Sequence, residues 1–304
     1  MQIPFFLTID TEGDNIWDRP KYIKSTNVEN LYRFQELCNI YHIKPIYLTN
    51  YEASINKLFQ KFIEEHNNNL EIGLHLHAWN SPPIYNLTEN DYFYQPYLHE
   101  YPKKIIKSKI DFMVKHLQDI FQTEIISHRG GRYSINDDIF ESLIENGIKI
   151  DCSVVPGINW SESIGNPNSK GGPDFRKSPR NAYYIYKSLL ELPVSTTSVN
   201  TALNYLSETN ILRRIISKIF NTKNLILRSK VSNLKELQKV IEWNLSQNCT
   251  HLEYIIHSSE LVQGTSSLIK SKKEEEIFYK NLEQFFMYLN TINIKSMTFK
   301  EYIK

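Results

Sequence analysis

The chain has 304 residues, of which 41% are hydrophobic and 23% are charged, and its formal net charge is +1 at pH 7. This near-neutral balance argues against a nucleic-acid partner and against a whole-chain attraction to an anionic membrane. The cysteines Cys38, Cys152 and Cys249 lie far apart and form no C-x-x-C pattern, which argues against a disulfide framework or a zinc–thiolate site.

Short apolar runs alternate with longer amphipathic segments along the chain. The predicted strands cover 3–10, 44–49, 70–77, 124–129, 148–155, 182–186, 189–194, 252–257 and 296–299. The predicted helices cover 26–42, 52–66, 102–121 and 134–147, and two of them begin with sequences that resemble capping boxes, at 26–29 and 134–137. This alternation predicts an α/β fold with a mostly parallel sheet, and seven or eight β units suit a closed or nearly closed barrel.

Two stretches interrupt the alternation. Residues 156–181 are rich in Gly, Pro, Ser and Asn, and we expect a long loop over the mouth of the site. Residues 201–248 read as a helical, basic insertion within a single domain that spans 1–304. Between 211 and 230 there are six Lys or Arg residues and no acids, alternating with apolar residues. This pattern is typical of peripheral membrane contact, with a solvated helical insertion as the alternative.

The chain shows no other membrane signal. The first residues lack the basic region of a signal peptide, and no apolar run reaches the roughly 20 residues that a membrane helix needs. We therefore expect a cytoplasmic protein.

Polar residues fall at or near the ends of the predicted strands. They are Asp10, His77, Arg129, Asp151 and His257. In parallel barrels the chemistry sits at the carboxyl ends of the strands, so this placement predicts one shared site.

The first motif is Thr-Ile-Asp-Thr-Glu-Gly-Asp at 8–14. Asp10 and Glu12 share a face by strand alternation, and adjacent buried carboxylates need a cation or a shared proton. A simple turn is the alternative for this segment.

The second motif, Gly-Leu-His-Leu-His, places His75 and His77 on one face of a strand, where they can share a metal. One core histidine and one exposed histidine is the alternative.

The third motif, His-Arg-Gly-Gly-Arg-Tyr, delivers Arg129 into a glycine-rich turn, where it can hold a carboxylate or stabilise an oxyanion. A structural ion pair is the alternative, and both can hold together. In the fourth motif, Ile-Ile-His-Ser-Ser-Glu, His257 ends an apolar strand and can protonate a leaving group.

Taken in order, and with Leu-Glu-Leu-Pro-Val at 190–194, these motifs resemble those of the NodB-like polysaccharide deacetylases, in particular a cytoplasmic, surface-polysaccharide-associated branch. The resemblance runs from about residue 3 to residue 300. It implies a distorted (β/α)7 barrel and one divalent metal ion, for which we expect zinc. It also implies that Asp10 is the catalytic base, Arg129 the arginine that orients it, His257 the catalytic acid and His75 a metal ligand.

Two positions depart from the family pattern. Thr11 stands where the family has a metal-binding aspartate, and Glu12 is the nearest substitute. Trp79 stands where the family has the second histidine of His-x-x-x-His, so His77 would replace that ligand. Whether Asp10 or Glu12 binds the metal is therefore left open.

The resulting hypothesis is a metal-dependent hydrolase that removes an N-acyl group from an amino sugar or glycan precursor, in surface polysaccharide biosynthesis. Glu12, His75 and His77 are its predicted metal ligands. The predicted substrate contacts are Trp79, Tyr133, Trp160, Asp174, Arg176 and Glu260. The alternative is a metal-independent or inactive carbohydrate-binding relative of the same fold.

Overall fold

The structure, a computed structural model, describes residues 2–169, 171–197 and 224–304. Within these ranges the strands form one sheet in the order β6-β7-β5-β4-β3-β2-β1-β8, and β9 pairs with β1. The strands are β1 (Ile3–Thr11), β2 (Pro45–Thr49), β3 (Glu71–Leu76), β4 (Ser127–Gly130), β5 (Ile150–Asp151), β6 (Tyr183–Ile185), β7 (Leu189–Glu191), β8 (Leu252–His257) and β9 (Ile294–Ser296). Neighbouring strands run parallel, except for the antiparallel pair β6 and β7.

The sheet curls into an open, distorted barrel. The chain that follows β7 reaches β8, where the Ser195 amide donates to the Glu253 carbonyl at 3.1 Å. A second segment joins there, because the Leu227 amide donates to Ser195 at 2.8 Å and the Ile255 amide donates to Leu227 at 3.1 Å. The two ends of the strand order therefore approach each other through irregular chain. This arrangement confirms the predicted fold class, an α/β fold with a distorted barrel.

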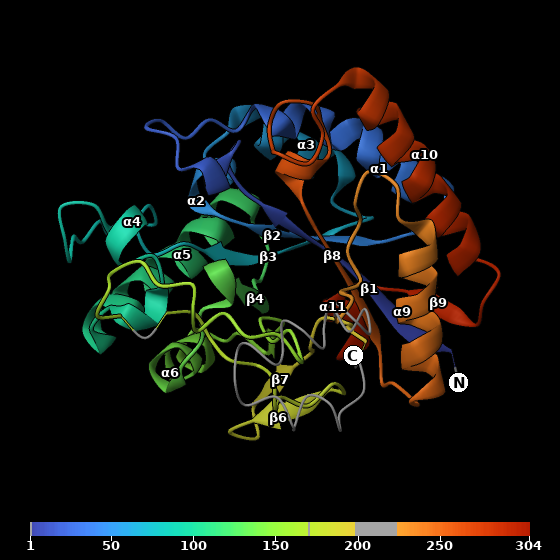
Figure 1. Ribbon diagram of the computed structural model, residues 1–304. Coiled ribbons are helices and arrows are strands. Elements are labelled where there is room, and N and C mark those ends of the chain that lie inside the picture. The colour runs from blue at the N-terminus through green and yellow to red at the C-terminus, as the bar shows by residue number, and fades with distance from the viewer. Residues whose placement is uncertain (1, 170, 198–223) are drawn as a thin grey trace.

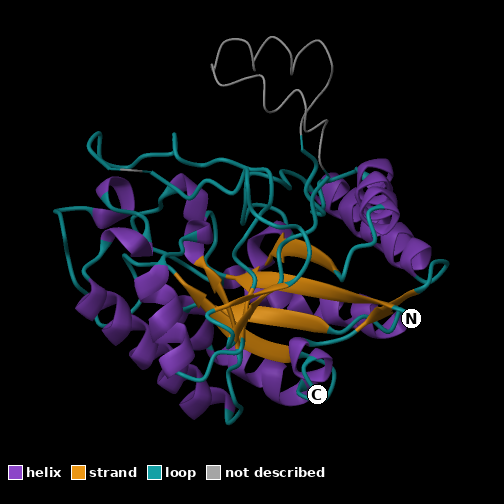
Figure 2. Cartoon of the chain, turned by 90° about the horizontal axis from the view of Figure 1, so that it is seen from below, coloured by secondary structure: helices purple, strands orange, loops and turns teal. Residues whose placement is uncertain are grey.

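Helices lie around the strands (Figure 1), and loops gather on one side of the sheet (Figure 2). The helices are α1 (Leu31–Ile40), α2 (Tyr51–Ser54), α3 (Lys57–His66), α4 (Asp91–Tyr94), α5 (Lys103–Phe121), α6 (Asp137–Glu145), α9 (Leu234–Ser246), α10 (Lys272–Leu289) and α11 (Phe299–Tyr302). None of the helices in the described ranges combines the length and the apolar character needed to cross a membrane.

Apolar side chains cover both faces of the central strands, as expected for strands between a barrel interior and a helix layer. Phe5, Leu7 and Ile9 of β1 belong to the large cluster shared with the helices, whereas Phe6 belongs to a smaller cluster. In the smaller cluster the Phe6 ring packs 4.8 Å from the ring of Phe299 in α11. Apolar packing thus fills the sheet near the start of β1, and polar residues concentrate at its other end.

Several predicted boundaries are wrong, and asparagine or aspartate caps explain three of them. The predicted helix 52–66 is two helices, because the Asn56 side chain accepts the amides of Leu58 and Phe59 and starts α3 anew. The helix predicted from 134 begins at Asp137, since Asn136 is its N-cap. The segment 26–42 starts as a 3-10 turn (η2, Thr26–Asn30) that is bound by the Asp14 carboxylate.

Two predicted strands also differ from the structure. The strand predicted at 148–155 pairs only over β5, and the chain beyond it turns irregular. The strand predicted at 296–299 lies earlier, as β9, and α11 begins at Phe299.

The two interrupting stretches are described only in part. Residues 156–181 are irregular, with one isolated bridge between Asn159 and Asp174. Residues 201–223 of the basic insertion predicted at 201–248 lie outside the described residues. Of its described part, 224–230 are irregular rather than helical, with isolated bridges at Ile226 and Arg228, and α9 forms the helical end. The membrane contact predicted for 211–230 falls outside the described residues except for 224–230, so it remains a prediction.

Candidate metal centre and active site

The sheet brings four of the predicted site residues to one edge. β1 lies between β2 and β8, and the pairing register sets Asp10 beside His257. In the same way β3 and β4 set His75 beside Arg129. All four side chains are buried. The structure therefore places residues that are far apart in sequence at the carboxyl ends of neighbouring parallel strands.

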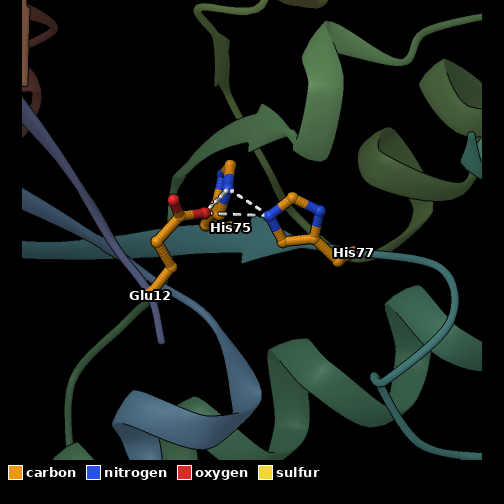
Figure 3. A group of neighbouring side chains, drawn as sticks. All are labelled: Glu12, His75 and His77. Atoms are coloured by element: carbon orange, nitrogen blue, oxygen red, sulfur yellow. Dashed lines mark hydrogen bonds and ion pairs between the residues drawn. The ribbon is translucent and has the colours of Figure 1, made fainter. Parts of the chain in front are cut away.

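Glu12, His75 and His77 form a compact, buried group that could hold a metal ion. Figure 3 shows the three side chains pointing toward one another, with Glu12 just after β1 and the histidines at the end of β3. Glu12 Oε2 lies 3.0 Å from His77 Nε2 and 3.6 Å from His75 Nε2, and the two Nε2 atoms are 3.1 Å apart. Ligand atoms about 2.0–2.1 Å from a tetrahedral ion are roughly 3.3 Å apart, so these separations suit one shared ion.

The hydrogen bonds around this group also fit a cation. His75 Nδ1 donates to the Arg129 carbonyl oxygen at 2.9 Å, which leaves Nε2 as a lone-pair donor facing the group. Glu12 Oε1 and His77 Nδ1 are buried without a hydrogen-bond partner in the described structure.

Burial opposes the charged form of Glu12, but His257, His75 and His77 outweigh it and lower the pKa of Glu12 below its usual range. Burial lowers the pKa of His77 to about 4, so its imidazole is neutral. An anion and neutral imidazoles are the ligand types that zinc-like ions bind.

Asp10 forms an ion pair with a fully buried arginine. Arg129 Nη1 donates to Asp10 Oδ1 at 2.7 Å, and Nη2 donates to Thr8 Oγ1 at 2.7 Å and to Glu253. Burial raises the pKa of Asp10, but the Arg129 charge and the nearby histidines outweigh it and lower that pKa overall. Asp10 is thus a fixed, charged carboxylate beside the metal group, which suits a base.

His257 faces both carboxylates of the first motif. Its Nε2 lies 3.7 Å from Asp10 Oδ2 and 3.9 Å from Glu12 Oε1, and its Nδ1 lies 3.2 Å from Glu260 Oε2. Burial disfavours the imidazolium, but Glu260 and Glu12 outweigh burial and the opposing Arg228 charge, and the pKa of His257 rises. His257 therefore has the character of an acid that is oriented by Glu260.

The predicted substrate contacts divide into two groups. Trp79 packs on His77 with ring centroids 4.4 Å apart, and Glu260 Oε2 lies within hydrogen-bond distance of His257 Nδ1. Tyr133 stacks on Trp160 with ring centroids 4.7 Å apart, and burial raises the pKa of its hydroxyl group. Asp174 and Arg176 pair with each other in an exposed loop. Asp151, another strand-end residue, pairs with His128 at 2.6 Å.

Other side chains around the metal group were missed by the sequence analysis. Trp17 lies edge-on to His77 at 6.5 Å and to His257 at 5.9 Å. Arg228 donates to Glu260 and lies 3.0 Å from His257 Nδ1. Glu52 binds Asn80, and burial raises the pKa of its carboxyl to about 7. Arg132 stands in the third motif, but its contacts depend on loop packing that no local pattern reveals.

Comparison with known proteins identifies the fold. No family model matches the chain, and no curated protein matches it significantly. Among solved structures, a protein described as a polysaccharide deacetylase from Mycobacterium smegmatis has a TM-score of 0.53 and 10% identity, covering 98% of this chain and 88% of that chain. The 4-alpha-glucanotransferase of Thermococcus litoralis has a TM-score of 0.53 and 14% identity, covering 100% of this chain and 40% of that chain.

A pseudoenzyme of carbohydrate esterase family 4 from Bacillus anthracis also matches, with a TM-score of 0.47 and 10% identity, over 100% of this chain and 66% of that chain. At such low identity, similarity to solved structures shows the fold and leaves the activity to the site. The chain therefore has the distorted-barrel α/β fold that is seen in a polysaccharide deacetylase, with a buried Glu/His/His group that could bind a divalent metal ion.

Proposed function

We propose that this protein is a metal-dependent amide hydrolase that removes an acetyl or similar N-acyl group from an amino sugar or glycan precursor. The observation that supports it is the grouping of three buried ligand-type side chains with an Asp–Arg pair and a histidine. Zinc as the ion, a role in surface polysaccharide biosynthesis and a cytoplasmic location belong to the same proposal, and they rest on the sequence motifs.

Each residue has a chemical task in this proposal. A divalent ion held by Glu12, His75 and His77 would supply Lewis acidity toward water and the acyl oxygen. Asp10 accepts a proton from the attacking water, while Arg129 holds its Oδ1 at 2.7 Å. His257 donates a proton to the departing nitrogen, so that water and the amide give a carboxylic acid and an amine.

The proposal is tested by metal content and acyl release in the same preparations. We expect purified protein to hold one divalent ion per chain and to release acetate from N-acetylated amino sugars. The double variant His75→Ala/His77→Ala should lose both properties. His42→Asn is the matched control, since His42 is exposed with a left-handed φ of 58° that asparagine tolerates. Unchanged metal content and turnover in the double variant would refute the proposal.

The alternative is a metal-independent or inactive carbohydrate-binding relative. It is favoured by Thr11 and Trp79, which stand at positions where the NodB-like polysaccharide deacetylases have metal ligands. Stoichiometric sugar binding by a protein that holds no metal and releases no acyl group would support this alternative.

A further inference from the structure

Arg132 is held in an aromatic cage beside the metal group. Its guanidinium carbon lies 5.4 Å from the ring centre of Trp17, 5.8 Å from that of Trp79 and 5.7 Å from that of Tyr97. These rings come from three separate segments of the chain. Trp17 follows β1, Trp79 follows β3, and Tyr97 lies after α4. Cation–π contacts of this kind hold a guanidinium without neutralising its charge.

The backbone that presents Arg132 is strained and tightly packed. Arg132 and Tyr133 both have left-handed φ values, of 55° and 58°, which are unfavourable for residues other than glycine. The preceding Gly131 packs so closely on the metal group that a Cβ atom there would lie 2.5 Å from His77 Nδ1. Strained conformations concentrate at ligand sites, where the surrounding structure keeps them in place.

The charge of Arg132 is not compensated by an ion pair in the described part of the chain. Its Nε is buried without a hydrogen-bond partner, and the Tyr97 hydroxyl that it contacts is neutral. Glu100 acts on it only at a distance, and burial raises the pKa of Glu100, which disfavours the charged carboxylate. A partly buried arginine normally binds a carboxylate or a phosphate.

A second cation lies two residues after Trp17, one of the rings that hold Arg132. Arg19 stacks on Phe93, with its guanidinium carbon 4.4 Å from the ring centre, and it makes no ion pair with any described residue. Burial lowers the pKa of Arg19, and the charge of Arg132 lowers it further. Two like charges held near each other repel, so an anion between them would be stabilised by both.

We propose that Arg132, supported by Arg19, binds an oxyanion of the substrate, either a carboxylate or a phosphate group, so that the enzyme selects acidic N-acyl amino sugars over neutral ones. This inference rests on the proposed function, because it names the class of its substrate. Trp17 contacts Arg132, His77 and His257, so a sugar that reaches the metal group with its acyl amide can reach Arg132 with an acidic substituent.

The test compares binding of acidic and neutral sugars by tryptophan fluorescence, since Trp17 and Trp79 line the cage. The probes are N-acetylglucosamine, its 1-phosphate and its C6-carboxylate (uronic acid) form, which distinguishes phosphate from carboxylate recognition. We expect wild-type protein to bind at least one acidic sugar about ten-fold or more tightly than the neutral one, the value of one charge-assisted hydrogen bond. Arg132→Gln should abolish this preference, Arg132→Lys should keep part of it, and Arg19→Gln should reduce it.

Arg33→Gln is the matched control, because Arg33 of α1 also stacks on an aromatic ring, that of Tyr279, and is paired with Glu276. Equal binding of acidic and neutral sugars by wild-type protein, or a full preference in Arg132→Gln, would overturn the inference. Acetate release is measured in the same samples. Release without an acidic preference leaves the proposed function standing and removes this inference, whereas an Arg132-dependent preference without release supports an oxyanion site and removes the hydrolase proposal.

Discussion

Asp10 and Glu12 are two residues apart, yet their surroundings differ. Asp10 is bound by the guanidinium of Arg129, whereas Glu12 Oε2 faces the two imidazoles of His75 and His77. A carboxylate that is fixed by arginine is suited to accept a proton, and one that faces the ring nitrogens of two histidines is suited to bind a cation with them. The geometry therefore favours Glu12 as the ligand and Asp10 as the base.

These roles predict opposite effects of two matched amide substitutions. Glu12→Gln should lower metal affinity strongly, because it removes the one anionic ligand of the group. Asp10→Asn should keep the metal and reduce turnover by about 10²- to 10⁴-fold. Metal content by mass spectrometry and acetate release measure both effects. Loss of metal in Asp10→Asn, with retention in Glu12→Gln, would reverse the assignment.

We expect the buried carboxyl group of Glu253 to make the stability of the fold depend on pH. Burial raises the pKa of Glu253 to about 8, against an ordinary value of 4.5, although Arg129 opposes this. The folded state then binds more protons than the unfolded state between these values. This contribution is fully present below about pH 4.5 and is lost as the pH rises through 8.

Glu253→Gln imitates the protonated carboxyl and should flatten that part of the profile by at least about 1.4 kcal/mol, the value of one pKa unit. Urea unfolding between pH 5 and pH 8.5 measures it, with the exposed Glu64→Gln as control. A wild-type slope in Glu253→Gln would show that Glu253 is charged in the folded protein.

At the scale of elements, strands were easier to predict than helix ends. The strand predicted at 252–257 has the observed bounds of β8, because Tyr254, Ile255 and Ile256 are residues that favour strands. Helix starts depend on single side chains, and several neighbouring residues could act as the cap. Ser134 fits a capping pattern, but the structure uses Asn136, while Ser134 binds His99 instead.

The break between α2 and α3 makes a testable case of such a cap. Asn56 Oδ1 accepts the Leu58 amide at 2.9 Å, and its amide group donates to Ser25 Oγ at 3.0 Å. Asn56→Ala should therefore lower the free energy of unfolding by about 1–2 kcal/mol. Asn67→Ala, at the exposed far end of the same helix, should change it by less than about 0.5 kcal/mol. Equal effects at both ends, measured by urea unfolding, would rule out the capping role.

For the whole molecule, the sheet order explains which parts of the site a sequence can predict. Polar residues at the ends of parallel strands must meet at one edge, so Asp10, His75 and His257 could be placed together without coordinates. The positions of Trp17 and Arg132 depend on how loops from different strands pack on one another. No local periodicity encodes such packing, which is why the aromatic cage was missed.

Metal binding should also stabilise the whole fold. Glu12 and the two histidines lie at the ends of β1 and β3, and β2 lies between these strands in the sheet, so an ion held by the three side chains connects strands that are not neighbours. An ion that binds the folded state alone adds about 2.7 kcal/mol at one hundred times its dissociation constant. We therefore expect a chelator to lower the melting temperature by several degrees and added Zn²⁺ to restore it. Glu12→Gln and His77→Ala should melt at one temperature with or without the ion, whereas His42→Asn should respond as wild type does. A zinc response that survives both substitutions would place the stabilising ion at another site.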